Sequence, residues 1–509
     1  MASSIKITGM YSGLDTDTIV QRLMEIEKYK VDRQFRAKVT LEWKQEALKK
    51  VEDDIKEFKN TYLSVLGKFN MYSKNIYNVY DVIMTGSNTS AVTIKADYSA
   101  TAGSHVINQV NRLARASAVQ SAESVSVGSQ LSSSNSTKLK DLDFKNSMNF
   151  EDGKISFKIN GETFTFSEED TLQKVLNTVN SNGNAGVILN YSRLSDTFKI
   201  ESKKSGADSE IVIENITGTA FGENGAFGIA TGTFKNGVDA EVVIDGITVT
   251  RSSNTFTIDG ITYTLNETTK PEANIGFRLT QNVDKAVESI KGFVDAYNLL
   301  IIKLDTLLIE RKNSSERGYT PLTEDEKKAM SDEQIEKWEA IAKKGLLYND
   351  RSIRSMLDRL RRTLYATVSE AGISPAQIGI KTGHWANKGQ ITLDEDALRA
   401  ALENDPHQVM SVFTSISSSD DASVKYSENG ILKRISDVFD SYTKSSGMTL
   451  ASLGENIEDM VEKIDMMEEK MLELEEKYYQ KYAVMERALA KLQSQSDWLN
   501  SMLGSLTYR

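Results

Sequence analysis

Apolar side chains recur at helical spacing near the start of the chain. From Leu41 to Tyr72 they step by three and four residues, and only Lys44 interrupts the stripe. A shorter stripe of the same kind covers residues 19–26. It follows Asp15-Thr16-Asp17, whose side-chain oxygens can accept the free N–H groups of a first helical turn. These stretches are predicted to be amphipathic helices.

The pattern near the C-terminus is more regular and much longer. Nine apolar residues stand seven positions apart: Leu450, Ile457, Ile464, Met471, Tyr478, Met485, Leu492, Leu499 and Leu506. The companion positions are also apolar apart from Lys481 and Gln495, which is typical of a coiled coil. Thr449–Leu506 would form a rod of about 85 Å, longer than most globular helices. We therefore expect other chains, or the N-terminal stripe, to complete its apolar face.

Further helices are predicted between these two ends. An uninterrupted apolar stripe runs from Val283 to Leu308, and shorter helical patterns cover residues 353–368 and 432–442. The charged stretch between residues 311 and 345 contains Thr323 and Ser331, each placed to cap a helix. It is interpreted as one or two short exposed helices.

The middle of the chain, about residues 80–281, has a β-type composition. Three short runs of alternating β-formers each contain a turn dipeptide, Asn160-Gly161, Asp245-Gly246 or Asp259-Gly260. This is a strong hairpin signal, because both turn residues must adopt positive φ. One helix is predicted at residues 171–180, and stretches rich in Ser, Gly and Asn at 121–136 and 217–237 are interpreted as linkers or long loops.

The predicted fold class is therefore α+β and multi-domain, with long terminal helices forming a coiled-coil leg and helical base, and with inserted β-rich head domains. Four divisions are expected: a terminal helical leg at 1–44 and 455–509, a helical base with a small β-element at 45–112 and 282–454, a β-rich head domain at 113–148 and 237–281, and an inserted α+β head domain at 149–236.

The composition excludes several kinds of functional site. Zero cysteines exclude a thiolate nucleophile and any cysteine-based metal site, and the three histidines lie far apart in sequence. Asp15/Asp17 and Asp394/Asp396 are paired carboxylates, but helix capping explains them better than cation binding. No catalytic, cofactor or metal site is therefore expected. The net charge of −11 argues against nucleic-acid binding, and no run approaches the roughly 20 apolar residues of a membrane-spanning helix.

Particular motifs resemble one known family. The segment Gly13–Glu27, followed by Trp43, resembles the opening motif of bacterial flagellar capping proteins, also called flagellar hook-associated protein 2. Thr171–Ile213 resembles a short inserted motif shared by flagellins and hook proteins. Matches of family type continue in order at Tyr319–Leu322, Trp338, Gly345–Leu347, Ile391–Leu398, Val409–Phe413, Gly447–Leu450 and 485–499.

The resemblance implies a structural protein at the distal tip of the flagellar filament, outside the cell, that promotes folding and polymerisation of exported flagellin. The implied partners are further copies in a ring-shaped homo-oligomer, flagellin, the hook–filament junction proteins and a type III export chaperone. The N-terminus lacks the hydrophobic core of a cleaved signal, which agrees with export through the flagellar type III apparatus. The expected partner interface consists of apolar residues at both ends: Leu14, Ile19, Leu23, Ile26, Met485, Leu492, Leu499, Met502 and Leu506.

Two other functions remain open. The β-rich domains could belong to a surface adhesin that binds host glycans or mucus. An enzyme with its site in the β-rich middle is a third possibility, which the scarcity of His and the lack of Cys and clustered carboxylates make unfavourable.

Overall fold

A computed structural model describes residues 15–128, 130–131, 137–271, 273–312, 314–383 and 389–506. The chain forms two compact units. One combines Met1–Lys74 with Val287–Arg509, and the other is Asn75–Ala286. The first is mainly helical and the second is built of antiparallel sheets, so the predicted α+β multi-domain class is confirmed.

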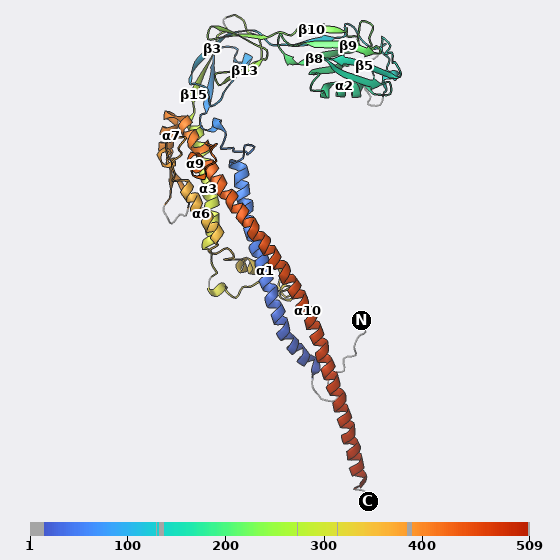
Figure 1. Cartoon of the computed structure of the whole chain (residues 1–509), viewed down its shortest axis with the longest axis vertical. Helices are drawn as coiled ribbons and strands as arrows, with labels where there is room; N and C mark the ends of the chain where they lie inside the picture. The colour runs from blue at the N-terminus through green and yellow to red at the C-terminus, as the bar shows by residue number, and fades with distance from the viewer. Residues whose placement is uncertain are drawn as a thin grey trace. The chain divides into compact units, whose positions relative to one another are not determined.

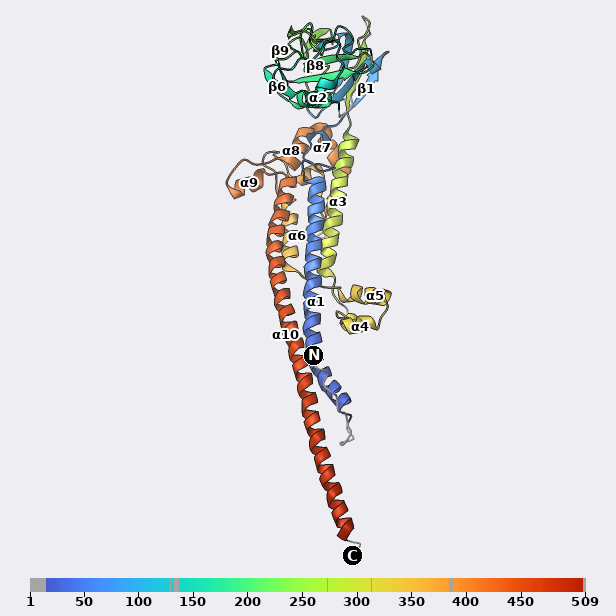
Figure 2. The same cartoon turned by 90° about the vertical axis from the view of Figure 1, so that its right-hand side faces the viewer.

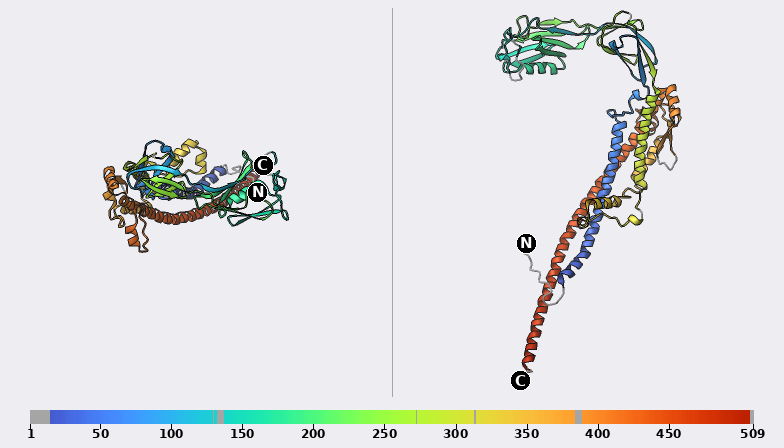
Figure 3. Two further views of the ribbon diagram at one scale, coloured as in Figure 1. Left: turned by 90° about the horizontal axis from the view of Figure 1, so that it is seen from above. Right: turned by 180° about the vertical axis from the view of Figure 1, so that it is seen from behind.

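The helical unit is organised around two long helices that lie side by side (Figures 1 and 2). These are α1 (Thr16–Tyr62, 47 residues) and α10 (Ile431–Leu506, 76 residues). They are antiparallel, because Lys59 near the end of α1 pairs with Asp440 near the start of α10, while Gln45 donates to the Leu450 carbonyl at 3.3 Å. Figure 3 shows the same pairing from behind. The expected pairing of the terminal stripes thus occurs within the chain.

Both long helices differ from the sequence-based expectation in their ends. The stripe from Leu41 to Tyr72 predicts a helix through Tyr72, but α1 stops at Tyr62, and Leu66 is almost fully exposed. At the other end, residues 432–442 belong to α10 and do not form a separate helix. Gly447 and Gly454 lie inside α10, where each glycine costs about 1 kcal/mol relative to alanine. The helix nevertheless continues, because α10 is held by buried residues before the two glycines, such as Tyr442, and after them, at Ile464.

Two more helices complete the helical core. They are α3 (Val283–Ile309) and α6 (Arg351–Thr363). The ring of Phe58 lies 5.8 Å from that of Phe293 and 5.9 Å from that of Phe439, so α1, α3 and α10 share one aromatic cluster. The remaining elements are α4 (Glu324–Lys328), α5 (Asp332–Ala342), α7 (Glu395–Asn404), α8 (Pro406–Thr414), α9 (Ala422–Glu428) and the hairpin of β16 (Ile380–Thr382) and β17 (Ile391–Leu393).

Several predicted caps are confirmed. The Asp15 carboxylate accepts from Thr18 N at 3.1 Å at the start of α1, and Asp394 accepts from Ala397 N at 3.1 Å at the start of α7. Thr323 and Ser331 each form a capping box, at α4 and α5 respectively. These side chains satisfy N–H groups that a helix leaves without internal partners.

The β-rich unit contains two separate hydrophobic cores. The first lies on a five-stranded sheet of order β1-β15-β3-β11-β12 and a three-stranded sheet of order β13-β14-β2. The strands are β1 (Tyr80–Thr85), β2 (Val92–Ala96), β3 (Gly103–Arg112), β11 (Ala240–Ile244), β12 (Ile247–Arg251), β13 (Thr255–Ile258), β14 (Ile261–Leu265) and β15 (Ile275–Gln281).

The second core lies between a four-stranded sheet of order β10-β9-β5-β6, a three-stranded sheet of order β4-β8-β7, and helix α2 (Leu172–Ser181). Its strands are β4 (Ala116–Gln120), β5 (Lys154–Ile159), β6 (Glu162–Ser167), β7 (Val187–Ser192), β8 (Thr197–Ser205), β9 (Ile211–Thr217) and β10 (Gly232–Phe234). All three hairpin turns have positive φ at both central residues, as predicted, and α2 matches the helix expected at 171–180.

The cores differ from the expected domain boundaries. Leu139, Phe144 and Met148 pack in the same core as β5 and β9, so an edge at residue 149 would cut through it. The segment with this core begins and ends where Arg115 and Val238 exchange two backbone hydrogen bonds of 2.8 and 3.0 Å. Similarly, β1, β2 and β3 share one core with β11 and β15, whereas the expected division places residues 45–112 in the helical base with its small β-element and residues 237–281 in the head domain. Apolar residues from distant segments share these cores, which linker composition does not reveal.

Candidate partner-binding surface

Helix α1 covers only part of the heptad face of α10. Val20 and Val31 of α1 are buried, and Ile464 of α10 is buried at 7% exposure. The heptad positions on either side, from Leu450 to Met485, are half-buried. Because α1 begins at Thr16 and runs antiparallel to α10, it provides this cover along the first part of the heptad series only.

The last turns of α10 carry large apolar side chains in solvent. Every residue at positions 491–503 is exposed, and we call this stretch the bared tip. Leu492 is 60% exposed, Trp498 59% and Leu499 52%. Such a concentration of apolar side chains on one helix end is typical of an interaction surface, because monomeric soluble proteins rarely expose contiguous apolar patches of this kind.

The residues expected at the partner interface occupy three environments. Ile19, Leu23 and Met485 are half-buried, and Ile26 is 61% exposed on α1. Leu492, Leu499 and Met502 belong to the bared tip. Leu14 lies outside the described residues, and the side chain of Leu506 is not described although its backbone ends α10. Their role in binding a partner therefore stays a prediction.

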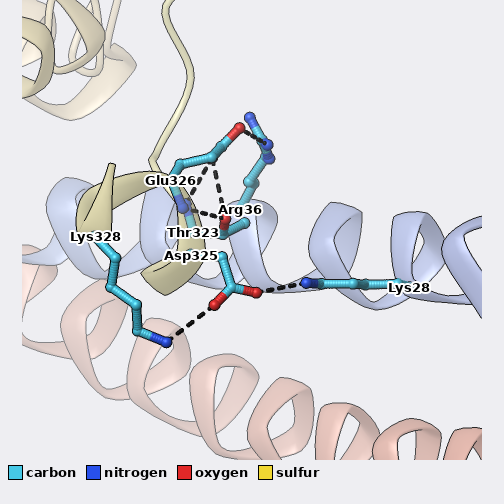
Figure 4. Close-up of polar contacts among 6 residues, drawn as sticks. All are labelled: Lys28, Arg36, Thr323, Asp325, Glu326 and Lys328. Carbon is cyan, nitrogen blue, oxygen red and sulfur yellow. Dashed lines mark hydrogen bonds and ion pairs between the residues drawn. The ribbon is translucent and has the colours of Figure 1, made fainter. Parts of the chain in front are cut away.

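A second feature of the same unit joins α4 to α1 through ion pairs (Figure 4). Lys28 Nζ lies 2.5 Å from Asp325 Oδ2, and Arg36 Nη2 lies 2.8 Å from Glu326 Oε1. Arg36 also donates to Thr320 Oγ1 at 2.5 Å. Lys28 and Arg36 are about two turns apart on α1, so adjacent acids of α4 reach both of them. We call these contacts the α4 clasp.

The clasp shifts the pKa of both acids. Hydrogen bonds from Lys28 and Lys328 lower the pKa of Asp325 to about 2. Burial tends to raise the pKa of Glu326, but hydrogen bonds from the Thr323 backbone and from Arg36 outweigh it, so that this pKa is lowered. Both carboxylates are thus held in their charged form by the groups they bind.

Aromatic contacts reinforce the clasp. The rings of Tyr319 and Trp338 lie 4.4 Å apart, and Trp338 Nε1 donates to the Thr320 carbonyl at 2.8 Å. Lys343 lies over the ring of Trp43 on α1, 5.2 Å from its centroid. The sequence identified the caps of α4 and α5 but missed the clasp, because its partners are about 290 residues apart. Only the abundance of alternating charges in residues 324–344 hinted at pairing.

Within the described part of the chain, no group of three or more acidic or histidine side chains could hold a metal ion. Among the described helices, none combines the length and the hydropathy needed to span a membrane.

Comparison with known proteins gives consistent matches over most of the sequence. The family described as flagellar hook-associated protein 2 C-terminus matches residues 237–494, and the corresponding N-terminus family matches residues 12–117. Flagellar hook-associated protein 2 of Halalkalibacterium halodurans is 28% identical over 483 residues, which cover 90% of this chain and 87% of that protein. Its counterpart in Thermotoga maritima is 26% identical, with coverage of 69% and 55%.

A solved structure of similar description is the flagellar cap protein FliD D1-D2-D3 domains from Escherichia coli. It aligns with a TM-score of 0.48 at 19% identity, covering 77% of this chain and 95% of that one.

Proposed function

The chain belongs to the flagellar hook-associated protein 2 family, and from this premise we propose how it acts as the cap of the flagellar filament. The observation that carries the proposal is the bared tip of α10. Complete burial of a fully exposed leucine side chain is worth about 1.5–3 kcal/mol. Leu492, Trp498 and Leu499 are 52–60% exposed, so each would gain part of that free energy on docking, and together they would hold the tip in place.

In this proposal the paired helices α1 and α10 form a leg that inserts among subunits at the end of the filament or at the hook–filament junction. The partners are further copies of the chain in a ring, flagellin, and the junction proteins. A type III export chaperone would cover the same apolar tip before assembly. Incoming flagellin would then fold in the space that the ring leaves beneath it, so the action is steric and needs no catalytic step.

The chain is a flagellum-associated protein, and we propose that it reaches the filament tip through the flagellar type III apparatus. The family is structural, so we infer that the protein is not an enzyme. No relative named above is described as an adhesin, and the adhesin alternative has no support.

The experiment replaces exposed leucines of α10 by glutamate in a strain that depends on this protein for capping. Leu492→Glu and Leu499→Glu place a charge on the heptad line of the bared tip, and we expect such strains to release flagellin monomers in place of filaments. The matched control is Leu472→Glu, because Leu472 is also exposed on α10, at 64%, but lies off that line.

All three leucines are exposed, so the folded proteins should unfold at the same denaturant concentration. Normal filaments with Leu492→Glu and Leu499→Glu would refute the docking role of the tip. A defect of equal size with Leu472→Glu would show that any added charge on α10 is harmful, and would also refute it.

A further inference from the structure

A pocket of about 610 Å³ opens between α6, α9 and α10, away from both the bared tip and the α4 clasp. Its lining includes four cations, Arg359, Arg362, Lys425 and Arg434, and one acid, Asp437. Lys433 forms an ion pair with Asp437 and neutralises it. This local excess of positive charge contrasts with the net charge of −11 of the whole chain.

The floor of the pocket is a buried guanidinium without a carboxylate. Arg434 is 1% exposed, and each of its hydrogen bonds goes to a backbone carbonyl. Its Nη1 donates to Ala366 O at 2.8 Å and its Nη2 to Thr367 O at 2.8 Å. The other acceptors are the carbonyls of Tyr426, Thr363 and Ser427. The Thr363 carbonyl lies at the C-terminal end of α6 and those of Tyr426 and Ser427 lie in the last turn of α9, where helices attract positive charge. The carbonyls of Ala366 and Thr367 lie in the loop that follows α6.

The dipoles of these carbonyls hold the Arg434 guanidinium in place. Among the described residues, however, no carboxylate forms an ion pair with it, so its full positive charge is not cancelled. A charge at low dielectric acts over a longer distance than one in water, so it raises the potential at the pocket surface.

The rim of the pocket adds cationic side chains that are accessible to a ligand. Arg362 and Lys425 are exposed, and neither forms an ion pair with a described residue. Arg359 is half-buried and donates to Ser441 Oγ at 2.7 Å. The exposed ring of Tyr426 packs against the Arg434 guanidinium, whose carbon lies 4.9 Å from the ring centroid.

We propose that this pocket binds an acidic segment of another polypeptide, with its carboxylates on Arg359, Arg362 and Lys425. The planar guanidinium of arginine fits a carboxylate through two parallel hydrogen bonds. The apolar side chains of Ala422 and Val438 in the same pocket provide contacts for a peptide that a bare inorganic anion would not use. The pocket volume lies within the usual range of ligand sites. The proposal is independent of the docking role of the bared tip.

The experiment measures binding of a fluorescently labelled peptide of alternating Glu and Ala to the full chain at low ionic strength. The test variant is Arg362→Gln/Lys425→Gln. The control is Arg354→Gln/Lys444→Gln, which removes the same two charges from exposed positions of α6 and α10 outside the pocket lining. We expect the test variant to bind at least about fivefold more weakly and the control to bind within twofold of the original chain.

Equal weakening in both variants would overturn the proposal, because it would reflect net charge alone. No measurable binding by the original chain would also overturn it. A competition experiment distinguishes a small-anion site from a peptide site. Displacement of the peptide by inorganic phosphate is compared with its displacement by sodium chloride at the same ionic strength. If phosphate displaces the peptide more effectively than chloride does, the pocket is a small-anion site and the assignment to an acidic polypeptide is refuted; equal displacement supports it.

Discussion

The two ends of helix α10 have similar apolar content but opposite surroundings. Near its start, the large apolar side chains from Ile431 to Tyr442 are at most 4% exposed, because α1, α6 and α8 pack against this part of the helix. Near its end, Leu492, Trp498 and Leu499 are more than half exposed. The heptad series continues into the second region without loss of regularity. Periodicity therefore identifies which face of a helix is to be covered, but not what covers it.

The largest contrast is expected in local stability. Opening free energies within one protein range from nearly zero at unpacked ends to the global free energy of unfolding in a core. In an isolated monomer, amides of residues 431–442 should therefore exchange at least about a thousandfold more slowly than those of residues 491–503. Hydrogen exchange with mass spectrometry measures this directly. Strong protection of 491–503 in a verified monomer would mean that the chain itself covers the tip.

The next largest contrast is expected when one side chain is truncated near the start of α10 and another near its end. Phe439→Ala removes a ring that is fully buried against Phe58, and we expect the helical unit to lose about 3–5 kcal/mol of stability. Leu499→Ala removes an exposed side chain and should cost less than about 0.5 kcal/mol. Urea unfolding followed by helical circular dichroism provides both values. Similar losses in the two variants would contradict the contrast.

A smaller but specific effect is expected at the buried cation near the start of α10. Arg434→Lys keeps the charge but offers three donors to five carbonyls, and its flexible ammonium cannot reproduce the planar fork. We expect a loss of about 2–3 kcal/mol. The matched Lys433→Arg change, at the adjacent half-buried position, should leave the urea midpoint almost unchanged. We call the five carbonyls that accept from Arg434 the carbonyl cage. If both changes have the same small effect, the carbonyl cage contributes little to the stability of the helical unit.

The smallest effect concerns the α4 clasp, which holds the exposed side of α1. Because the folded pKa of Asp325 is about 2, below its ordinary value of 3.8, the clasp is fully formed above about pH 4 and weakens as the pH falls through 2. Tryptophan fluorescence, to which Trp338 and Trp43 contribute, should change over this range and shift with added salt.

Asp325→Asn should already show the altered fluorescence at neutral pH. Glu333→Gln is the control, since the one ion pair of Glu333 with a described residue is that with Lys337 of its own helix α5. A pH response that is the same in wild type and Asp325→Asn would assign the change to other groups.

Local features of the chain were largely determined by its sequence. The caps at Asp15, Thr323, Ser331 and Asp394 and the three positive-φ turns arise from contacts within a few residues. The heptad line is a periodicity of the sequence itself. The position of the predicted interface on α10 followed from the same line. Such features can be inferred because their energetic causes lie within one turn or one hairpin.

Only the tertiary structure decided what depends on residues far apart in the chain. The stripe beyond Tyr62 predicted a helix that does not continue, and residues 432–442, expected as a separate helix, form the start of α10. The core shared by Phe144 and β5, the clasp between Arg36 and Glu326, and the carbonyl cage of Arg434 join segments separated by up to 290 residues. Their stability comes from burial and charge pairing after the chain has folded, and neither composition nor periodicity encodes the identity of a distant partner.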